Sequence, residues 1–282
     1  MRTAIVCEGG GMRGVFTAGV LQSFLDAEFM ADELVGVSAG ASNGASYVSR
    51  QSGRGYRTNL DYTNDKRYLS FSNWIKTGSL FGMEFIFREI PEKLDPFDFD
   101  AFYTSSTQYY AGACDVETGK TYFFGQDKMD RNLAALRASC SLPIFSPMVE
   151  VEGRKYIDGG VSDPIPFQKA LDDSCDFLVV VLTRERGYVK KPQNAHLLYR
   201  LLYNNYPRLR KTINERHLVY NQSLLHLKKL EASGTALVIA PPHPLPADRF
   251  GKDKPALEES YRIGLQMGQN ALPKIFNATQ KS

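Results

Sequence analysis

The chain has 282 residues, 43% of them hydrophobic and 23% charged, a composition typical of a globular protein with one or two domains. A net charge of +3 is too small to indicate binding to nucleic acid, and four widely spaced cysteines indicate reduced thiols rather than a disulfide framework. No stretch approaches the ~18 consecutive apolar residues of a membrane span, and the N-terminal apolar run is too short for a signal peptide. We therefore expect a cytoplasmic protein that contacts membranes, if at all, only peripherally.

The first fifty residues alternate between predicted strands and predicted helices. Thr3 to Glu8 is expected to form a short buried strand, and Val15 to Phe29 a helix whose apolar residues recur with a period near 3.6. Glu33 to Val37 is expected to form a second strand, followed by a helix of small residues from Ala39 to Ser49. This order predicts a parallel sheet in an α/β fold.

Residues 56–110 are rich in aromatic side chains. They hold 14 of the 33 aromatic residues of the chain, about twice the share expected for 55 of 282 positions. We expect an insertion of helices and loops beside the sheet, in which most rings fill the core and some line the mouth of a pocket. The sequence leaves open whether this insertion forms a mobile lid.

The remaining elements are predicted from turn residues and apolar runs. In chain order they are a hairpin over 109–124, a helix over 130–138, a hairpin over 149–157, a helix over 166–171, a strand over 177–182, helices over 196–232 broken at Pro207, a strand over 236–240 and a helix over 255–276. We predict a core over residues 1–182 and an extension, residues 183–282, packed on the same domain.

The segment Gly36-Val37-Ser38-Ala39-Gly40 has the Gly-x-Ser-x-Gly spacing of a nucleophile elbow. The pentapeptide alone is weak evidence, because a chain with 23 glycines can contain it by chance. Its context strengthens it, since a sharp turn between a strand and a helix would project the Ser38 hydroxyl, with Gly36 and Gly40 relieving the crowding. The alternative is that Ser38 is only a helix N-cap.

A glycine-rich loop directly follows the first predicted strand. It consists of Gly9, Gly10, Gly11, Met12 and Arg13, and Gly14 comes next. Such a loop can turn its amides toward the oxyanion of an acyl-transfer reaction, where one donor typically contributes about 3–4 kcal/mol. A dinucleotide-binding loop is the rival interpretation. It is disfavoured because the second strand ends without the acidic residue that would bind the ribose.

Asp158 is the predicted general base for Ser38. It follows the predicted strand at 155–157 and precedes Gly159 and Gly160, which would keep its carboxylate accessible. The four histidines, at positions 196, 217, 226 and 243, all lie late in the chain, outside any predicted strand end. A carboxylate with an ordinary pKa near ~3.9 is a poor base, so it must be positioned on the hydroxyl and partly desolvated.

Together these blocks resemble the patatin-like phospholipase family. Residues 9–14 are similar to its oxyanion loop, 36–40 to its elbow, Ala138-Ser139-x-x-x-Pro143 to its third block and 158–160 to its Asp-Gly-Gly/Ala block. Order and spacing match over about residues 3–182. Glu8 departs from the pattern, since many members have Asp or Ser there. The tail is similar to that of a bacterial subgroup of uncharacterised members.

The resemblance implies a three-layer α/β/α fold with a mainly parallel central sheet. It implies an esterase or phospholipase A-type hydrolysis of fatty acyl esters, with no cofactor and no metal. Carried over, Ser38 is the nucleophile and Asp158 the base of a Ser–Asp dyad without histidine, and amides of residues 9–13 hold the oxyanion. The implied partner is a lipid or another acyl ester substrate.

Several alternatives stay open. A protein on the same scaffold could bind lipid or regulate a partner without turnover. Arg13 fits a phosphate headgroup or an ordinary surface carboxylate equally well. The stretch 196–232 carries seven Lys or Arg residues and is expected to be a solvated helix face rather than a contact with anionic lipid. Acyl chain length, headgroup and oligomeric state do not follow from the sequence.

Overall fold

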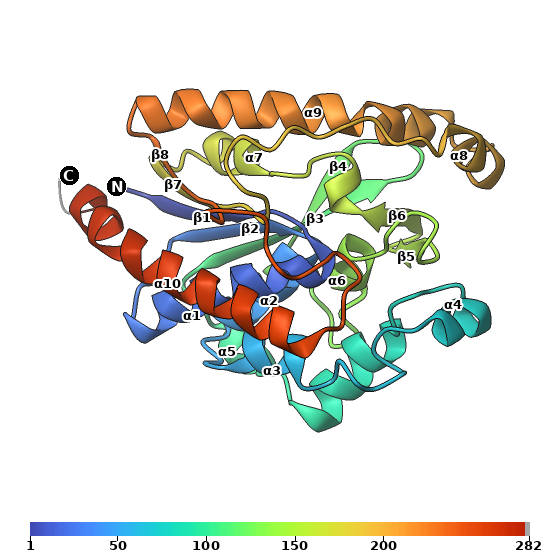
Figure 1. The fold of residues 1–282 in the computed structure, drawn as a ribbon, viewed down its shortest axis with the longest axis horizontal. Helices are drawn as coiled ribbons and strands as arrows, with labels where there is room; N and C mark the ends of the chain where they lie inside the picture. The colour runs from blue at the N-terminus through green and yellow to red at the C-terminus, as the bar shows by residue number, and fades with distance from the viewer. Residues whose placement is uncertain (280–282) are drawn as a thin grey trace.

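A single sheet organises the molecule, with β1 (Thr3–Cys7) between β2 (Glu33–Val37) and β7 (Phe177–Val181). The structure is a computed structural model that describes residues 1–279, so the last residues of the predicted extension, 280–282, lie outside it. Its eight strands have the order β5-β6-β3-β2-β1-β7-β8, with β4 paired to β3 (Figure 1). The other strands are β3 (Gln108–Asp115), β4 (Thr121–Gly125), β5 (Val149–Val151), β6 (Arg154–Asp158) and β8 (Ala236–Ile239).

The sheet is mainly parallel, as predicted. β1, β2, β3, β7 and β8 run in one direction. On one side of the sheet, β4 and β6 pair antiparallel with β3, and β5 pairs antiparallel with β6. Cys7 is in register with both Gly36 and Val181. The chain therefore leaves β1, β2 and β7 at the same edge of the sheet, which is where α/β folds place their ligands.

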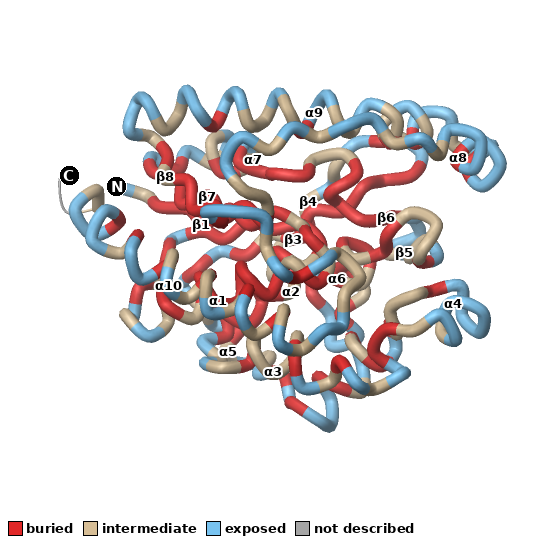
Figure 2. The backbone as a smooth tube through the Cα atoms, in the orientation of Figure 1, coloured by how far each residue is buried: buried red, intermediate tan, exposed pale blue. Residues whose placement is uncertain are grey.

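Helices cover both faces of this sheet, so the fold has three layers, with the sheet between two layers of helices (Figure 1). One face carries α1 (Val15–Asp26), α2 (Ala39–Val48) and α10 (Lys254–Thr279), and the other carries α7 (Phe167–Asp172) and α9 (Pro207–Ala232). Ile5 and Cys7 of β1 belong to the first apolar core, whereas Ala4 and Val6 belong to the second. This alternation follows from the two-residue period of a strand and leaves β1 buried on both sides (Figure 2).

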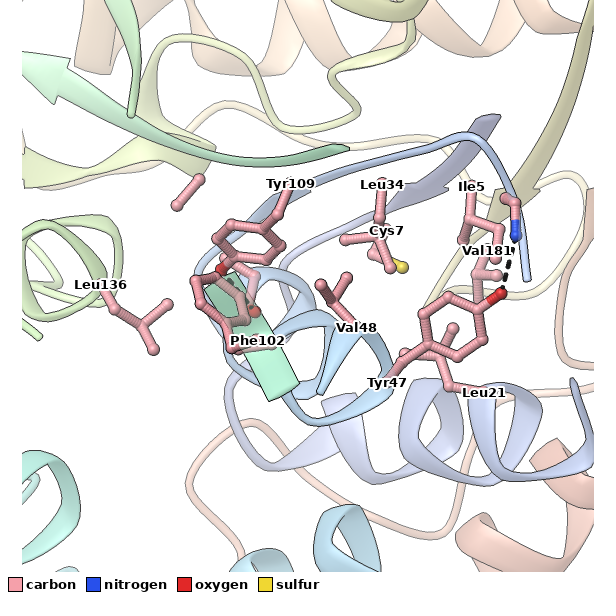
Figure 3. Packing of buried hydrophobic residues seen from close by; sticks show 14 of the residues in the cluster. Ile5, Cys7, Leu21, Leu34, Tyr47, Val48, Phe102, Tyr109, Leu136 and Val181 are labelled. Carbon is pink, nitrogen blue, oxygen red and sulfur yellow. Dashed lines mark hydrogen bonds between the residues drawn. The ribbon is translucent and has the colours of Figure 1, made fainter. Parts of the chain in front are cut away.

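Two tyrosines fix α2 to the core and to the loop that follows α1 (Figure 3). The Tyr109 hydroxyl donates to the Ala41 carbonyl at 2.8 Å, in the first turn of α2. The Tyr47 hydroxyl donates to the Phe29 carbonyl at 2.7 Å and accepts from the Ala31 amide at 3.0 Å. Both rings are almost fully buried, so these bonds satisfy polar atoms that burial would otherwise leave unpaired.

The aromatic-rich segment folds mostly into short helices. These are α3 (Arg54–Leu60), α4 (Phe71–Thr77), a π-helix (Phe85–Leu94) and α5 (Phe99–Tyr103). Asp95 binds Arg57 at 2.8 and 3.1 Å and lies 3.8 Å from Arg54, which ties the end of the π-helix to α3. Because β3 begins at Gln108, the last residues of the segment belong to the central sheet.

Other helices differ from the sequence expectation mainly at their ends. α1 ends at Asp26 rather than at position 29, and Glu28 beyond it has a left-handed backbone with φ of 54°. α6 (Ala134–Ser139) begins later than position 130, because Leu133 has φ of 52° and interrupts the helix. α8 (His196–Leu202) and α9 are separated before Pro207, which occupies the first position of α9. Among residues 1–279, no helix is long and apolar enough to cross a bilayer.

α10 packs on α1 through glycines at the contact. A Cβ built at Gly264 would collide with the Phe16 carbonyl, and one at Gly19 would collide with the Tyr261 carbonyl. The two backbones therefore approach more closely than helices with larger side chains would allow. This contact attaches the C-terminal helix to the first helix of the chain.

We expect Gly264→Leu to lower the free energy of unfolding by about 2 kcal/mol or more, because the new side chain must push α10 off α1. Chemical denaturation of the purified variant measures this change. Gln269→Leu, at an exposed position of the same helix, is the matched control and should stay within about 0.5 kcal/mol of wild type. Equal stability of the two variants would contradict the proposed packing.

Candidate active site

Ser38 occupies a strained turn between β2 and α2. Its φ of 55° and ψ of −129° are unfavourable for a residue with a side chain, and it is 7% exposed. The turn brings α2 close to β1, because a Cβ at Gly40 would come within 2.5 Å of the Cys7 carbonyl. A small residue is therefore required there. A Cβ at Gly36, two residues before Ser38 on β2, would lie 2.6 Å from the Ala41 amide nitrogen.

Ser139, from the third sequence block, supports this turn. The Ser38 amide donates to Ser139 Oγ at 2.9 Å, and Ser139 Oγ donates to the Gly112 carbonyl at 2.7 Å. Ser139 is fully buried at the end of α6. Its hydroxyl thus links the strained elbow to β3, the neighbouring strand of the sheet.

The glycine-rich loop lies directly beside Ser38. A Cβ at Gly9 would meet the Ser38 Cβ at 3.0 Å. Among residues 1–279, the amides of Gly9 and Gly10 have no hydrogen-bond partner, so they are free to donate to a bound group. The Met12 amide instead donates to the Arg249 carbonyl at 3.0 Å, and the Met12 side chain is buried.

Glu8 and Thr183 fix the start of this loop. Glu8 is buried, and its Oε2 accepts from the Thr183 amide at 2.7 Å. Thr183 Oγ1 donates to the Gly9 carbonyl at 3.1 Å. Burial raises the pKa of Glu8, which favours its neutral form, while the Thr183 amide, Tyr220 and the nearby cations lower it.

Asp158 ends β6 and is buried, with 3% exposure. Its Oδ1 accepts from the Gly160 amide at 2.8 Å across the short turn that begins at Gly159, whereas Oδ2 has no hydrogen-bond partner of ordinary geometry in the described residues. Burial raises the pKa of Asp158 above its usual range. The Ser38 side chain and the charges of Arg249 and Arg216 lower it and so oppose this effect.

Two cavities meet at Ser38. One has about 530 Å³ of space outside the atoms and is lined mainly by apolar side chains of α2, the aromatic-rich segment and the loop after α6, including Tyr68, Phe81, Met83, Ile86, Phe87 and Leu142. The other, about 420 Å³, is polar. Its walls bring together the predicted residues Gly9, Gly10, Gly11, Arg13, Ser38, Asp158 and Gly160. Gly11, Ser38 and Leu142 line both cavities.

The histidines lie elsewhere. His196 contacts Asn214 at 2.8 Å, His217 contacts the Asn214 carbonyl at 3.0 Å, and His226 packs edge-on against Phe167. None of the four histidines lines either cavity at Ser38. Residues 1–279 also contain no group of three His, Cys, Asp or Glu residues arranged to hold a metal ion. Asp158 is the carboxylate that the fold places beside Ser38.

Sequence reasoning missed three groups near Asp158. Lys190 and Arg249 follow β7 and β8, and Arg216 lies on α9, in the stretch expected to be a solvated face. The Arg216 Nε donates to the Gly160 carbonyl. A signal for Arg216 did exist, since the buried residues of α9 recur at intervals of four or seven positions, at Leu209, Ile213, Tyr220 and Leu227. Position 216 belongs to that stripe.

Comparison with known proteins identifies relatives for most of the chain. A family model described as patatin-like phospholipase matches residues 5–171, more than half of the chain, and a domain of unknown function (DUF6363) matches residues 206–280. The uncharacterized protein YjjU of Escherichia coli (strain K12) is 29% identical over 280 residues, which cover 97% of this chain and 78% of that protein.

More distant matches extend the comparison. The uncharacterized NTE family protein Mb1092c of Mycobacterium bovis is 26% identical over 182 residues, covering 64% of this chain and 48% of that protein. The crystal structure of VipD from Legionella pneumophila superposes with a TM-score of 0.48 at 10% identity, covering 94% of this chain and 67% of that one. On the family match, this chain belongs to the patatin-like phospholipase family.

Proposed function

We propose that this protein is a serine acyl hydrolase of the lipid esterase or phospholipase A type, in which Ser38 and Asp158 form a catalytic dyad. Family membership supports lipid hydrolysis in general. The observation that carries the dyad is the convergence of a strained serine, a buried carboxylate and free loop amides in one cavity. Four cysteines without a disulfide in the described residues fit a reducing compartment such as the cytoplasm.

Acylation begins with attack of Ser38 Oγ on the ester carbonyl. The hydroxyl proton moves to Asp158 Oδ2, the carboxylate oxygen without a hydrogen-bond partner. The carbonyl oxygen becomes an oxyanion, which accepts hydrogen bonds from the amides of Gly9 and Gly10 and from other amides of the loop up to Arg13. The Met12 amide is not among these donors, because it donates to the Arg249 carbonyl. The carbon–oxygen bond to the alcohol then breaks, and Asp158 returns the proton to the leaving oxygen.

Deacylation repeats these steps with water. Asp158 takes a proton from the water that attacks the acyl-serine. It returns this proton to Ser38 Oγ as the bond between Ser38 and the acyl carbon breaks and the fatty acid is released. Burial gives Asp158 the basicity that an exposed aspartate lacks, because it raises the pKa of the carboxyl group. The apolar cavity on the other side of Ser38 suits the hydrocarbon chain of the acyl group.

An exposed apolar surface next to the site fits a lipid substrate. Phe71 and Ile75 of α4 are 63% and 70% exposed, and Leu197 and Leu201 of α8 are 81% and 77% exposed. Both helices contact Ile144, since Trp74 Nε1 donates to its carbonyl at 3.2 Å and its amide donates to the Tyr203 hydroxyl, just after α8, at 3.1 Å.

Ile144 and Asp158 line one further cavity, so this apolar surface adjoins the proposed base. Arg200 on α8 and Lys76 on α4 add positive charge beside the exposed apolar side chains. Apolar side chains flanked by cations match the interface of an anionic lipid bilayer. We therefore place the membrane contact on α4 and α8 rather than on the outer face of α9.

We expect Ser38→Ala and Asp158→Asn each to lower kcat on a chromogenic fatty ester by about 10³-fold or more, because each removes one half of the dyad. Asp163→Asn removes a neighbouring carboxylate outside the cavity of Ser38 and is the matched control, with turnover close to wild type. Near wild-type turnover in either dyad variant would exclude the proposed mechanism.

A fluorophosphonate probe distinguishes the enzyme from a lipid-binding protein without turnover. We expect the probe to label folded wild-type protein and to leave Ser38→Ala unlabelled, since it reacts only with an activated serine. A folded wild-type sample that neither reacts with the probe nor cleaves any ester would support the binding protein instead.

The pH profile of kcat/KM should have an acid limb set by Asp158. The base works only when ionised, so activity falls as pH drops through a pKa that burial has raised above the usual aspartate value. Arg249→Gln removes a charge that lowers this pKa, so its acid limb should move to higher pH. A limb that stays in place, or moves to lower pH, would contradict the assignment of Asp158.

Replacing Phe71, Ile75, Leu197 and Leu201 together by Ser should weaken binding to anionic vesicles by about tenfold or more, because the apolar contact area is lost. Turnover of a short, monomeric ester should stay within about twofold of wild type. Leu218→Ser, at a 58% exposed position of α9, is the control for an exposed leucine outside this surface. Vesicle sedimentation measures the binding of wild type, the fourfold variant and Leu218→Ser. Equal binding by these three proteins would refute the docking surface.

A further inference from the structure

The polar cavity beside Ser38 is unusually rich in positive charge. Five cationic side chains line it, against the two carboxyl groups of Glu8 and Asp158. They come from segments far apart in the sequence, namely the glycine-rich loop, the segment after β7, α9 and the segment after β8. The five are Arg13, Arg184, Lys190, Arg216 and Arg249.

None of these five cations forms an ion pair within residues 1–279. Other arginines of the chain do form ion pairs. Arg57 binds Asp95 at 2.8 Å, and Arg186, two residues from Arg184, binds Glu231 at 2.8 Å. The two carboxyl groups that line the cavity, those of Glu8 and Asp158, can offset at most two of the five positive charges. The cavity therefore carries excess positive charge.

These cations also act on one another. Burial, then the charge of Arg216, lowers the pKa of Lys190 to about 7 and that of Arg249 to about 10. Burial likewise lowers the pKa of Arg13, with Arg184 adding to the effect. Partly buried like charges are costly unless an anion offsets them. An anion that enters the cavity would gain from this uncompensated field.

The position of the charges relative to Ser38 defines what part of a substrate would meet them. The apolar and polar cavities share Gly11, Ser38 and Leu142. An ester held at Ser38 with its acyl chain in the apolar cavity can direct its alcohol portion into the polar one. The guanidinium of Arg216 is fixed there by its bond to the Gly160 carbonyl. Arginine is well suited to hold phosphate oxygens in a fixed geometry.

We propose that the polar cavity is a phosphate subsite, so that the preferred substrate is an acyl ester whose alcohol carries a phosphate group close to the ester oxygen. This inference rests on the proposed hydrolase function and narrows its substrate class. It resolves the alternative for Arg13 in favour of the headgroup. It also gives the segment matched by the domain of unknown function a role in substrate binding, since Arg216 and Arg249 both belong to that segment.

The kinetic test compares two substrates with the same short acyl chain, both kept monomeric: a monoacylglycerol and the corresponding monoacylglycerol phosphate. Wild type should prefer the phosphate ester by about 10²-fold in kcat/KM. Arg216→Gln and Lys190→Gln should each reduce that preference by about 10-fold or more, because each removes a charge-assisted hydrogen bond. Both esters depend on the same Asp158, so the ratio of their two kcat/KM values within one variant cancels any effect of the substitution on this residue.

Lys211→Gln is the matched control, since it removes an exposed positive charge from the same helix, outside the cavity. Its preference should equal that of wild type. A wild type that cleaves both esters equally well would overturn the phosphate subsite while leaving the hydrolase standing. Failure to cleave either ester, with no fluorophosphonate labelling, would instead remove the proposed function.

Binding to the inactive Ser38→Ala protein separates a headgroup from a free anion. Calorimetry should show that glycerol 3-phosphate binds, and that adding Arg216→Gln weakens this binding by about 10-fold or more. Binding of inorganic phosphate together with a kinetic preference for the phosphate ester supports the subsite. Binding of inorganic phosphate without any kinetic preference shows a site for a free anion and overturns the proposal.

Discussion

The backbone of Ser38 lies in a region that costs a residue with a side chain about 1–3 kcal/mol, and it persists only because the surroundings hold it. Gly40 lets α2 approach the end of β1, and Ser139 accepts the Ser38 amide from the side of β3. These contacts come from three different strands or helices. The position of the serine hydroxyl therefore depends on the packing of the whole carboxyl edge of the sheet, and the cavities on either side follow from it.

Asp158 is held between two opposing influences. Burial disfavours its charge, whereas Arg216 and Arg249 favour it. Burial raises the pKa of this carboxyl group and so increases its basicity, whereas the cations lower the pKa and favour the ionised form. An anion that offsets the cations would shift this balance toward greater basicity. In our proposal the substrate's own phosphate is that anion, which would couple binding of the correct headgroup to activation of the base.

Much of the fold and of the site could be predicted because the relevant signals are local. Ser38 directly follows β2, Asp158 is the last residue of β6, and the glycines of residues 9–11 lie just after β1, so strand prediction and neighbouring glycines sufficed to select them as candidates. Parallel pairing of β1 with β2 then placed two of these loops together. Helix ends were less predictable, because single residues such as Leu133 adopt left-handed backbones without any glycine to indicate it.

Contacts between distant segments could not be predicted in this way. Ser139 is 101 residues from Ser38, and nothing in its own neighbourhood indicates that its hydroxyl would meet the elbow amide. Arg216 was expected on a solvated face, because composition does not show which residues of a basic stretch face inward, and no sequence signal singled out Arg249. Only the spacing of apolar residues along α9 separates position 216 from Lys211.

The C-terminal segment is therefore better regarded as part of the active-site structure than as an appendage. α10 is packed against α1 through Gly264, and α1 begins where the glycine-rich loop ends. The carbonyl of Arg249 accepts from the Met12 amide, so the same segment shapes the loop that, in our proposal, supplies the oxyanion donors. Its side chains also supply two of the five cations around Asp158. In our proposal this segment shapes the oxyanion loop, lowers the pKa of the base and lines the headgroup cavity, so it would constrain both the rate and the substrate of the reaction. That is a physical reason for it to accompany the patatin-like core in one chain.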